Sequence, residues 1–345
     1  MASGHPLELV LVQELEKFHF EVVKIIQLSP DRPFAVMTVQ NEGGGPIHIC
    51  KMALPQSDPG KAREVNQAML SEIDFVQHVE PFLMSKLPIE FRERIALPEY
   101  IFSNKDGDMP FLVEERFTGT MLGDIHRADL IIVNNDLRII LGFIRALNEL
   151  PVDFVKKVIP TIVDRTSNPH HWYERAKNEM EKYRGPLEQV VAPTDLELMA
   201  NFLTDQQGFV DDFETPVFTA GDINPSNIML LPDERLGFFD WERIKITTSP
   251  VHDYGFMYVD LWEAPNLQQW YLDAIFNVQT DMGFWKMMRF DVLFNRCIGE
   301  INHWTSVLKR NPSHDAGKIA HRALGFYAKE VHNILQLKDR WARGS

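Results

Sequence analysis

The stretch Phe218–Glu242, FTAGDINPSNIMLLPDERLGFFDWE, decides the fold of this 345-residue chain. Two apolar runs within it, Ile228–Leu231 and Leu236–Phe239, have the length and composition of short buried strands. The segment Pro232–Arg235, with the sequence PDER, turns the chain between them. We therefore predict a β-hairpin.

Three polar side chains are spaced around this hairpin. Asn227 follows Asp222 by five positions, and Asp240 follows Asn227 by thirteen. Such a hairpin brings these three side chains together at one end. They are a loop aspartate, an asparagine that enters the first strand and an aspartate that leaves the second. Their oxygens suit a hard cation such as Mg²⁺ and a hydroxyl group that needs orientation. The alternative is a polar turn and a strand-ending aspartate in an unrelated α/β domain.

The run AGDINPSN…FFDWE resembles the catalytic core of the aminoglycoside phosphotransferase and choline kinase superfamily, which shares the protein-kinase fold. The family pattern is His-Gly-Asp, four variable residues, Asn, and then a strand that ends in Asp-Trp or Asp-Phe. The resemblance implies that Asp222 is the catalytic base and that Asn227 and Asp240 ligate Mg²⁺. The chain departs from the pattern at Ala220, which replaces the family histidine.

The resemblance also implies an α+β, bilobal, protein-kinase-like fold. A small antiparallel-sheet N-lobe (residues 1–118) would bind the nucleotide, and a larger, mostly helical C-lobe (residues 119–345) would carry the catalytic and acceptor-binding groups. The N-terminal sequence fits this picture, because a predicted helix over residues 6–18 precedes three β-like runs. These runs are Phe20–Leu28, Phe34–Gln40 and Ile47–Leu54. We expect residues 80–110 to form a strand-and-loop connection.

One lysine, Lys51, lies in the third predicted strand between apolar neighbours. Such a lysine is often solvent-exposed at a sheet edge, but the resemblance implies that Lys51 contacts the α- and β-phosphates of ATP. Ile49, two residues earlier on the same face, would then pack on the adenine ring. Glu64 and Glu72, in the predicted helix 59–79, are both candidates to hold Lys51. We favour Glu72, because the helical stripe that follows it resembles the family helix more closely.

Two further segments are expected to contact the nucleotide. The turn SPDRP after the first strand contains no glycine, so Ser29 or backbone N–H groups would cover the phosphates. The segment MPFLVEERFTG resembles the family's hinge and places Glu115 and Phe117 beside the adenine edge. Gly119 then lets the chain turn into the second lobe. The triple glycine at residues 43–45 lacks the lysine and Ser/Thr of a P-loop and is predicted to be a hairpin turn.

Acidic residues follow the hairpin in the segment SPVHDYGFMYVDLW. The resemblance implies that Asp253 is structural and accepts backbone N–H bonds from the catalytic loop. Asp260 and Glu263 lie seven and ten positions later, roughly on the same predicted helical face. They would either bind an ammonium group of the acceptor or be ordinary surface charges.

The composition is that of a soluble globular protein, with 45% hydrophobic and 24% charged residues. The net charge of −14 argues against nucleic acid and anionic membranes as partners, and is compatible with a cationic acceptor. Cys50 and Cys297 form no disulfide framework or metal motif, which fits a reducing, cytoplasmic location. The sequence has no signal-peptide pattern and no membrane-spanning run of about 20 apolar residues.

These residues indicate an ATP- and Mg²⁺-dependent phosphotransferase that acts on a hydroxyl group of a small aminoglycoside-, amino-alcohol- or sugar-like molecule. The alternative is a nucleotide-binding pseudokinase that acts as a binding module. The joint presence of Lys51, Asp222, Asn227 and Asp240 favours the enzyme. The sequence leaves the identity of the acceptor open.

Overall fold

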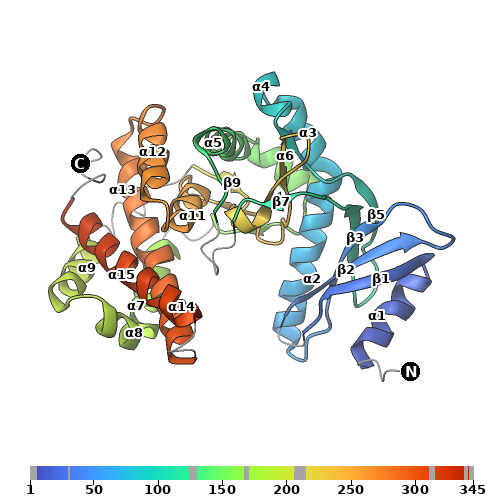
Figure 1. The fold of residues 1–345 in the computed structure, drawn as a ribbon, viewed down its shortest axis with the longest axis horizontal. Helices are drawn as coiled ribbons and strands as arrows, with labels where there is room; N and C mark the ends of the chain where they lie inside the picture. The colour runs from blue at the N-terminus through green and yellow to red at the C-terminus, as the bar shows by residue number, and fades with distance from the viewer. Residues whose placement is uncertain are drawn as a thin grey trace.

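An antiparallel five-stranded sheet forms most of the N-terminal lobe (Figure 1). The computed structural model describes residues 6–29, 32–123, 130–166, 171–205, 215–310, 315–337 and 341. The strand order is β1-β2-β3-β6-β5. The bounds are β1 (Phe20–Gln27), β2 (Phe34–Asn41), β3 (His48–Ala53), β5 (Tyr100–Asn104) and β6 (Phe111–Glu115), and helix α1 (Pro6–Glu16) precedes them. The three predicted strands are thus confirmed within two residues at either end.

The long helix that follows the sheet carries Glu72. Helix α2 (Pro59–Asp74) is capped by the Asp58 side chain, which accepts a hydrogen bond of 2.7 Å from Lys61 N, and it has proline in its first turn. It continues through a π-helical segment, η1 (Phe75–Val79), into helix α3 (Glu80–Lys86).

The expectation of a strand-and-loop connection over residues 80–110 is wrong in its first part. Helices α3 and α4 (Ile89–Arg92) occupy it before strands β4 (Ile95–Ala96) and β5 begin. The prolines of this segment lie where helices tolerate them. Pro81 is in the first turn of α3, and Pro88 is the N-cap of α4.

The predicted hairpin is present as strands β10 (Ile228–Leu230) and β11 (Leu236–Phe238). It lies at the centre of a four-stranded sheet with the order β4-β11-β10-β7, in which β7 is Thr120–Met121. At Gly119, a Cβ atom would lie 2.3 Å from Leu230 O, so only glycine allows β7 to approach β10. We propose the lobe boundary at residue 118 because the chain leaves the five-stranded sheet at Glu115 and joins the hairpin sheet at Thr120.

A third, three-stranded sheet brings distant parts of the chain beside the hairpin. Its order is β8-β12-β9, with β8 at Val163–Asp164, β12 at Lys245–Thr247 and β9 at Val217–Thr219. Lys245 of β12 lies opposite both Val163 and Thr219. Because Thr219 is three residues before Asp222, this sheet fixes the position of the Asp222 loop.

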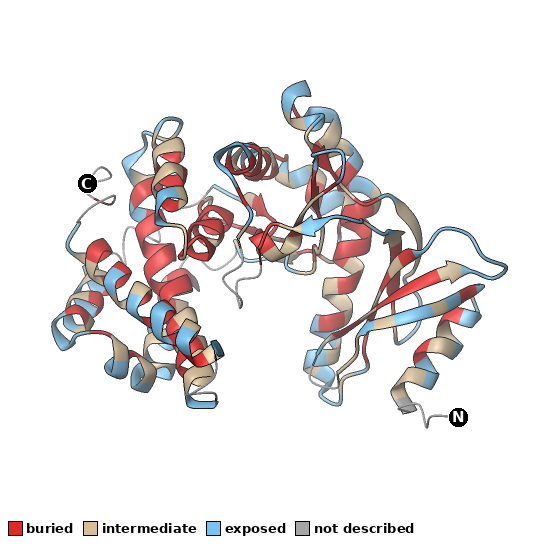
Figure 2. Ribbon diagram, viewed as in Figure 1, coloured by how far each residue is buried: buried red, intermediate tan, exposed pale blue. Residues whose placement is uncertain are grey.

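Helices make up the rest of the described C-terminal lobe. Helix α11 is buried on nearly all sides, as Figure 2 shows, so its polar residues lie inside the protein. None of the helices in the described ranges is long and apolar enough to cross a bilayer. The bounds are α5 (Asn134–Asn148), α6 (Val152–Val158), α7 (His171–Lys182), α8 (Arg184–Val190), α9 (Pro193–Asp205), α11 (His252–Asp260), α12 (Pro265–Phe276), α13 (Met282–Phe290), η3 (Asp291–Cys297), α14 (Ile298–Arg310) and α15 (Asp315–Leu335), together with the short helix η2 (Pro225–Asn227).

Candidate active site

A buried carboxylate holds the loop that carries Asp222. Asp253 on α11 accepts hydrogen bonds from Ala220 N (3.0 Å) and Gly221 N (2.7 Å). The predicted structural role of Asp253 is thereby confirmed. Gly221 has φ = +81°, and a Cβ atom there would lie 2.4 Å from Arg243 O, so this position requires glycine.

Asp222, Asn227 and Asp240 come together, as the sequence spacing predicted. All three line a small cavity of about 10 Å³, which is close to the space that one water molecule or ion occupies. The Asn227 Nδ2 group donates to Asp222 O (3.0 Å). Because this bond fixes the amide nitrogen, the amide oxygen of Asn227 remains available as a ligand. An amide oxygen beside a carboxylate is a donor set that fits Mg²⁺.

Lys51 connects the N-lobe sheet to the end of the hairpin. Its Nζ atom lies 2.9 Å from Glu72 Oε2 and 2.5 Å from Asp240 Oδ1. The partner on α2 is therefore Glu72 and not Glu64. The Glu72 carboxylate also accepts a hydrogen bond of 3.0 Å from Trp241 N, so it joins α2 to the residue after Asp240.

Glu242, which the sequence analysis missed, is a third carboxylate at this lysine. Its Oε2 atom lies 2.9 Å from Lys51 Nζ. No spacing rule identified it, because Glu242 lies in a turn after β11 and Asp240 has φ = +70°, outside the extended region. Three carboxylates around one ammonium group leave a formal charge of −2, which a divalent cation would neutralise.

The protonation behaviour of this site follows from burial and charge. Burial alone would lower the pKa of Lys51, but Asp240, Glu72 and Glu242 reverse the effect and raise it well above its usual value. Burial raises the pKa of Glu72 to about 7, against the opposing effect of Lys51. Burial also raises the pKa of Asp222, although Arg243, with Nε 3.4 Å from Asp222 Oδ2, opposes this. A carboxyl group with a raised pKa is a stronger base, as a proton acceptor requires.

The other residues predicted to bind nucleotide lie along the N-lobe. Ile49 is half-buried and lies two residues before Lys51 on β3. Ser29 is half-buried just after β1, whereas the next two residues of the SPDRP turn are outside the described ranges. Glu115 is exposed at the end of β6, and Phe117 packs closely on Gly237 of β11. Their contacts with a nucleotide stay predictions.

The two acidic residues expected on the acceptor side differ from each other. Asp260 is only 5% exposed, so the alternative of an ordinary surface charge is wrong for this residue. Burial, followed by the charges of Glu300 and Asp222, raises its pKa well above the usual value. Helix α11 ends at Asp260, so the expected helical face does not extend to Glu263, which instead forms an ion pair of 2.8 Å with Arg322.

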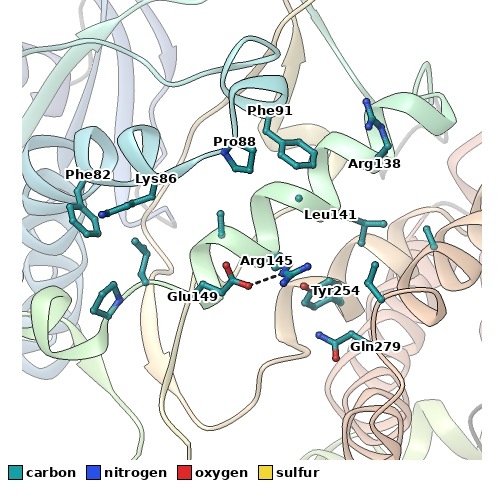
Figure 3. A pocket seen from close by; sticks show the side chains of 16 residues that line it. Phe82, Lys86, Pro88, Phe91, Arg138, Leu141, Arg145, Glu149, Tyr254 and Gln279 are labelled. Atoms are coloured by element: carbon teal, nitrogen blue, oxygen red, sulfur yellow. Dashed lines mark hydrogen bonds and ion pairs between the residues drawn. The ribbon is translucent and has the colours of Figure 1, made fainter.

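A separate cavity of about 710 Å³ lies away from these residues (Figure 3). Its walls come from α3, α4, α5 and the end of α12 and are mainly apolar, and an ion pair of 2.7 Å between Arg145 and Glu149 crosses one side. It contains none of the predicted site residues.

Comparison with known proteins adds evidence at the level of structure. No protein-family model matches the chain, and no curated protein sequence matches it. Among solved structures, a GDP and kanamycin complex of the aminoglycoside phosphotransferase APH(2")-IIIa is similar, with a TM-score of 0.56 and 13% identity over 94% of this chain and 99% of that one. The GDP complex of wild-type aminoglycoside 2'-phosphotransferase-IIIa gives a TM-score of 0.56 and 14% identity, with coverages of 95% and 98%.

Spectinomycin phosphotransferase APH(9)-Ia, in complex with ADP and spectinomycin, gives a TM-score of 0.52 and 14% identity, with coverages of 96% and 98%. Identities this low carry information about the fold alone. The likeness nevertheless extends over nearly the whole of each chain. The protein has the bilobal, kinase-like α+β fold of the aminoglycoside phosphotransferases.

Proposed function

We propose that this protein is an ATP- and Mg²⁺-dependent phosphotransferase that transfers a phosphoryl group to a hydroxyl of a small molecule. The observation that supports it most directly is the contact of Lys51 Nζ with Asp240 Oδ1 at 2.5 Å, beside a cavity that Asp240 shares with Asp222 and Asn227. Phosphoryl transfer requires these groups in one place, because the protein's contribution is positioning and charge neutralisation.

Each group has a distinct task in this proposal. Lys51, fixed by Glu72, aligns the α- and β-phosphates of the nucleotide. Asp240 and the amide oxygen of Asn227 hold Mg²⁺, which offsets the negative charge that gathers on the transferred phosphoryl group. Asp222 accepts a hydrogen bond from the acceptor hydroxyl and takes its proton as the new O–P bond forms and the bond between the γ-phosphorus and the bridging oxygen of ADP breaks, so that ADP leaves. Asp253 keeps the Asp222 loop in place through its two backbone hydrogen bonds.

The structural neighbours support the class of ligands. Their complexes contain GDP or ADP and, in two cases, kanamycin or spectinomycin. We extend from these a purine nucleotide, with ATP as donor, and a small hydroxylated acceptor of the aminoglycoside, amino-alcohol or sugar kind. Both cysteines of the chain are free and buried, which supports the reducing, cytoplasmic location that we propose.

The experiment that tests this function is a screen for transfer of radiolabelled γ-phosphate from MgATP to a panel of hydroxylated compounds. The panel spans amino alcohols, sugars, aminoglycosides and hydroxy acids, and Asp222→Asn serves as the matched inactive control. We expect labelled product with the wild-type protein and its loss in the variant. Stabilisation by MgATP without transfer to any compound would overturn the proposal and would indicate a nucleotide-binding module instead.

A further inference from the structure

A group of basic side chains gathers around His252 on α11, the residue before Asp253. Lys245 Nζ is 2.7 Å from His252 Nε2, and Arg296 Nη2 is 3.1 Å from His252 Nδ1. Arg296 also donates to His252 O (3.0 Å) and lies over the ring of Phe256 at 3.5 Å. His252 is 3% exposed, and burial, followed by these two cations, holds its pKa well below the usual value. The neutral imidazole has one unprotonated nitrogen, so it accepts a hydrogen bond from one of the two cations, and Asp291 Oδ1 lies 3.5 Å from His252 Nδ1.

Two arginines join this group from other elements. Arg165 follows β8, and its backbone N–H donates to Ile246 O (3.0 Å), directly beside Lys245. Arg175 lies on α7, three residues after Trp172. The indole Nε1 of Trp172 donates to Thr248 Oγ1 (3.3 Å), and its ring centroid is 6.0 Å from that of His252. This packing places the start of α7, and with it Arg175, against the strand that carries Lys245.

Among the described residues, only some of these cations have a carboxylate within ion-pair distance. Asp291 pairs with Arg296 at 3.5 Å, Asp222 pairs with Arg243, and Asp253 accepts its two backbone hydrogen bonds. Asp260, Glu300 and Glu64 interact with the group only over longer distances. Among the described residues, neither Lys245 nor Arg175 has a carboxylate within ion-pair distance.

The electrostatics agree with this count. Burial lowers the pKa of Lys245 to about 7, and the charges of Arg296, Arg175 and Arg165 add to the effect, against Asp253. His252 is followed by Asp253, whose carboxylate accepts hydrogen bonds from the two residues before Asp222, so the basic group lies close to the loop of the proposed base. An ammonium-bearing acceptor would be repelled here, whereas an oxyanion would supply the missing counter-charge.

We propose, on the basis of the phosphotransferase function above, that the acceptor alcohol carries an oxyanion, either a carboxylate or a phosphate, which Arg175 and Lys245 bind while its hydroxyl faces Asp222. Arginine and lysine suit this task because both form charge-assisted hydrogen bonds to oxyanions. The acidity of the whole chain therefore does not predict the charge of the acceptor.

The test uses three probes that share a vicinal hydroxyl frame and differ in charge. They are glycerol 3-phosphate, glycerol and 3-amino-1,2-propanediol, with binding measured by calorimetry and transfer measured with MgATP. We expect glycerol 3-phosphate to bind at least about tenfold more tightly than the other two, a difference of about 1.4 kcal/mol. Its affinity should fall as the pH rises above about 7, as Lys245 loses its proton.

The variants Arg175→Gln and Lys245→Met should each weaken glycerol 3-phosphate about tenfold and leave the Kd of MgATP within about twofold. Arg184→Gln and Lys318→Met, which remove exposed cations of the same kinds elsewhere on the C-lobe, are the matched controls and should change neither affinity. Arg175 is only half-buried on a surface helix, so its variant keeps the test valid if Lys245→Met does not fold.

Each other outcome has a defined meaning. Equal or absent binding of the three probes, or unchanged binding in both variants, would overturn the oxyanion site. A fall in MgATP affinity with unchanged probe binding would assign the cations to the nucleotide and would overturn it too. Binding that depends on Arg175 and Lys245, with no transfer to any compound of the wider screen, would keep the site and reject the phosphotransferase function.

Discussion

Two lysines, Lys51 and Lys245, lie in surroundings of opposite charge. Lys51 contacts three carboxylates, and its pKa is raised well above the usual value. Lys245 lies among arginines and a neutral histidine, and its pKa falls to about 7. Burial lowers the pKa of both amines, but the carboxylates around Lys51 overcome this effect, whereas the arginines around Lys245 add to it.

The comparison supports a division of tasks between the surroundings of the two lysines in the proposed function. The three carboxylates around Lys51 outnumber its single positive charge, which suits a metal cation with its nucleotide. The charges of Arg296, Arg175 and Arg165 act on Lys245, which suits an anionic group. The Asp222 carboxyl is influenced by both groups, because Asp240 raises its pKa and Arg296 lowers it. Changes to each side should therefore have separable effects.

The largest effect is expected on the Lys51 side. Asp240→Ala removes a proposed metal ligand and the carboxylate 2.5 Å from Lys51 Nζ. We expect turnover to fall at least about a thousandfold, since metal stabilisation of the transition state is worth several kcal/mol. Steady-state transfer assays measure it. Asp233→Ala, in the exposed turn of the same hairpin, is the control, and an Asp240→Ala enzyme with a tenth of wild-type turnover would contradict the proposed role.

The next largest effect is expected between the two sides. Asp222→Asn keeps the shape of the side chain and removes its ability to take a proton. Loss of a positioned base lowers turnover by about 10²- to 10⁴-fold. The Kd of MgATP should stay within about twofold, because the proposed phosphate contacts come from Lys51 and Asp240. A fully active variant would refute the assignment of Asp222 as base.

A smaller effect is expected where α11 supports the loop. Asp253→Asn leaves one acceptor oxygen for two backbone N–H donors, at Ala220 and Gly221. We expect unfolding in urea to show a loss of about 1–3 kcal/mol, the cost of one unsatisfied buried group. Turnover should fall with it, because the Asp222 loop loses a tether. A variant as stable and active as the wild type would show that Asp253 does not hold the loop.

The smallest effect is a pH-dependent stability difference on the Lys245 side. The folded-state pKa of Lys245, about 7, is below its usual value of 10.5. Below pH 7 both states hold the proton, and the folded protein bears the full cost of the buried cation. Between pH 7 and 10.5 only the unfolded state is protonated, so wild-type stability rises with pH.

Lys245→Met should therefore exceed the wild type in stability by the largest margin below pH 7, and the margin should shrink toward pH 10.5. Urea unfolding of both proteins at pH 6 and pH 9 measures this difference. The wild type and Lys318→Met, which removes an exposed lysine, should differ by the same amount at both pH values. A margin for Lys245→Met that does not change with pH would show that Lys245 keeps an ordinary pKa.

The local parts of the fold and site were predictable from sequence. Short-range patterns predict the hairpin strands, the N-lobe strands and the convergence of Asp222, Asn227 and Asp240. None of these strands in the structure extends more than one residue beyond its predicted bounds. Helices α3 and α4 were missed, although each has a proline at its start, where helices accept proline.

The basic group around His252 was not predictable in this way. Lys245 comes from β12, His252 from α11 and Arg296 from η3, and no periodicity or spacing joins these elements. Only the packing of α11 inside the C-lobe brings them together. Charge counts over the whole chain pointed toward a cationic acceptor, because a count contains no information about where the charges lie.

One backbone angle has an evolutionary consequence. Asp240 has φ = +70°, in the left-handed region, where glycine and asparagine fit easily and most other residues are strained. The replacements that the backbone tolerates best at this position are therefore the ones that remove the negative charge. Under the role proposed for Asp240, a descendant of this protein could lose its chemistry by a single exchange and keep its shape, and position 240 would be where active and inactive copies are first told apart.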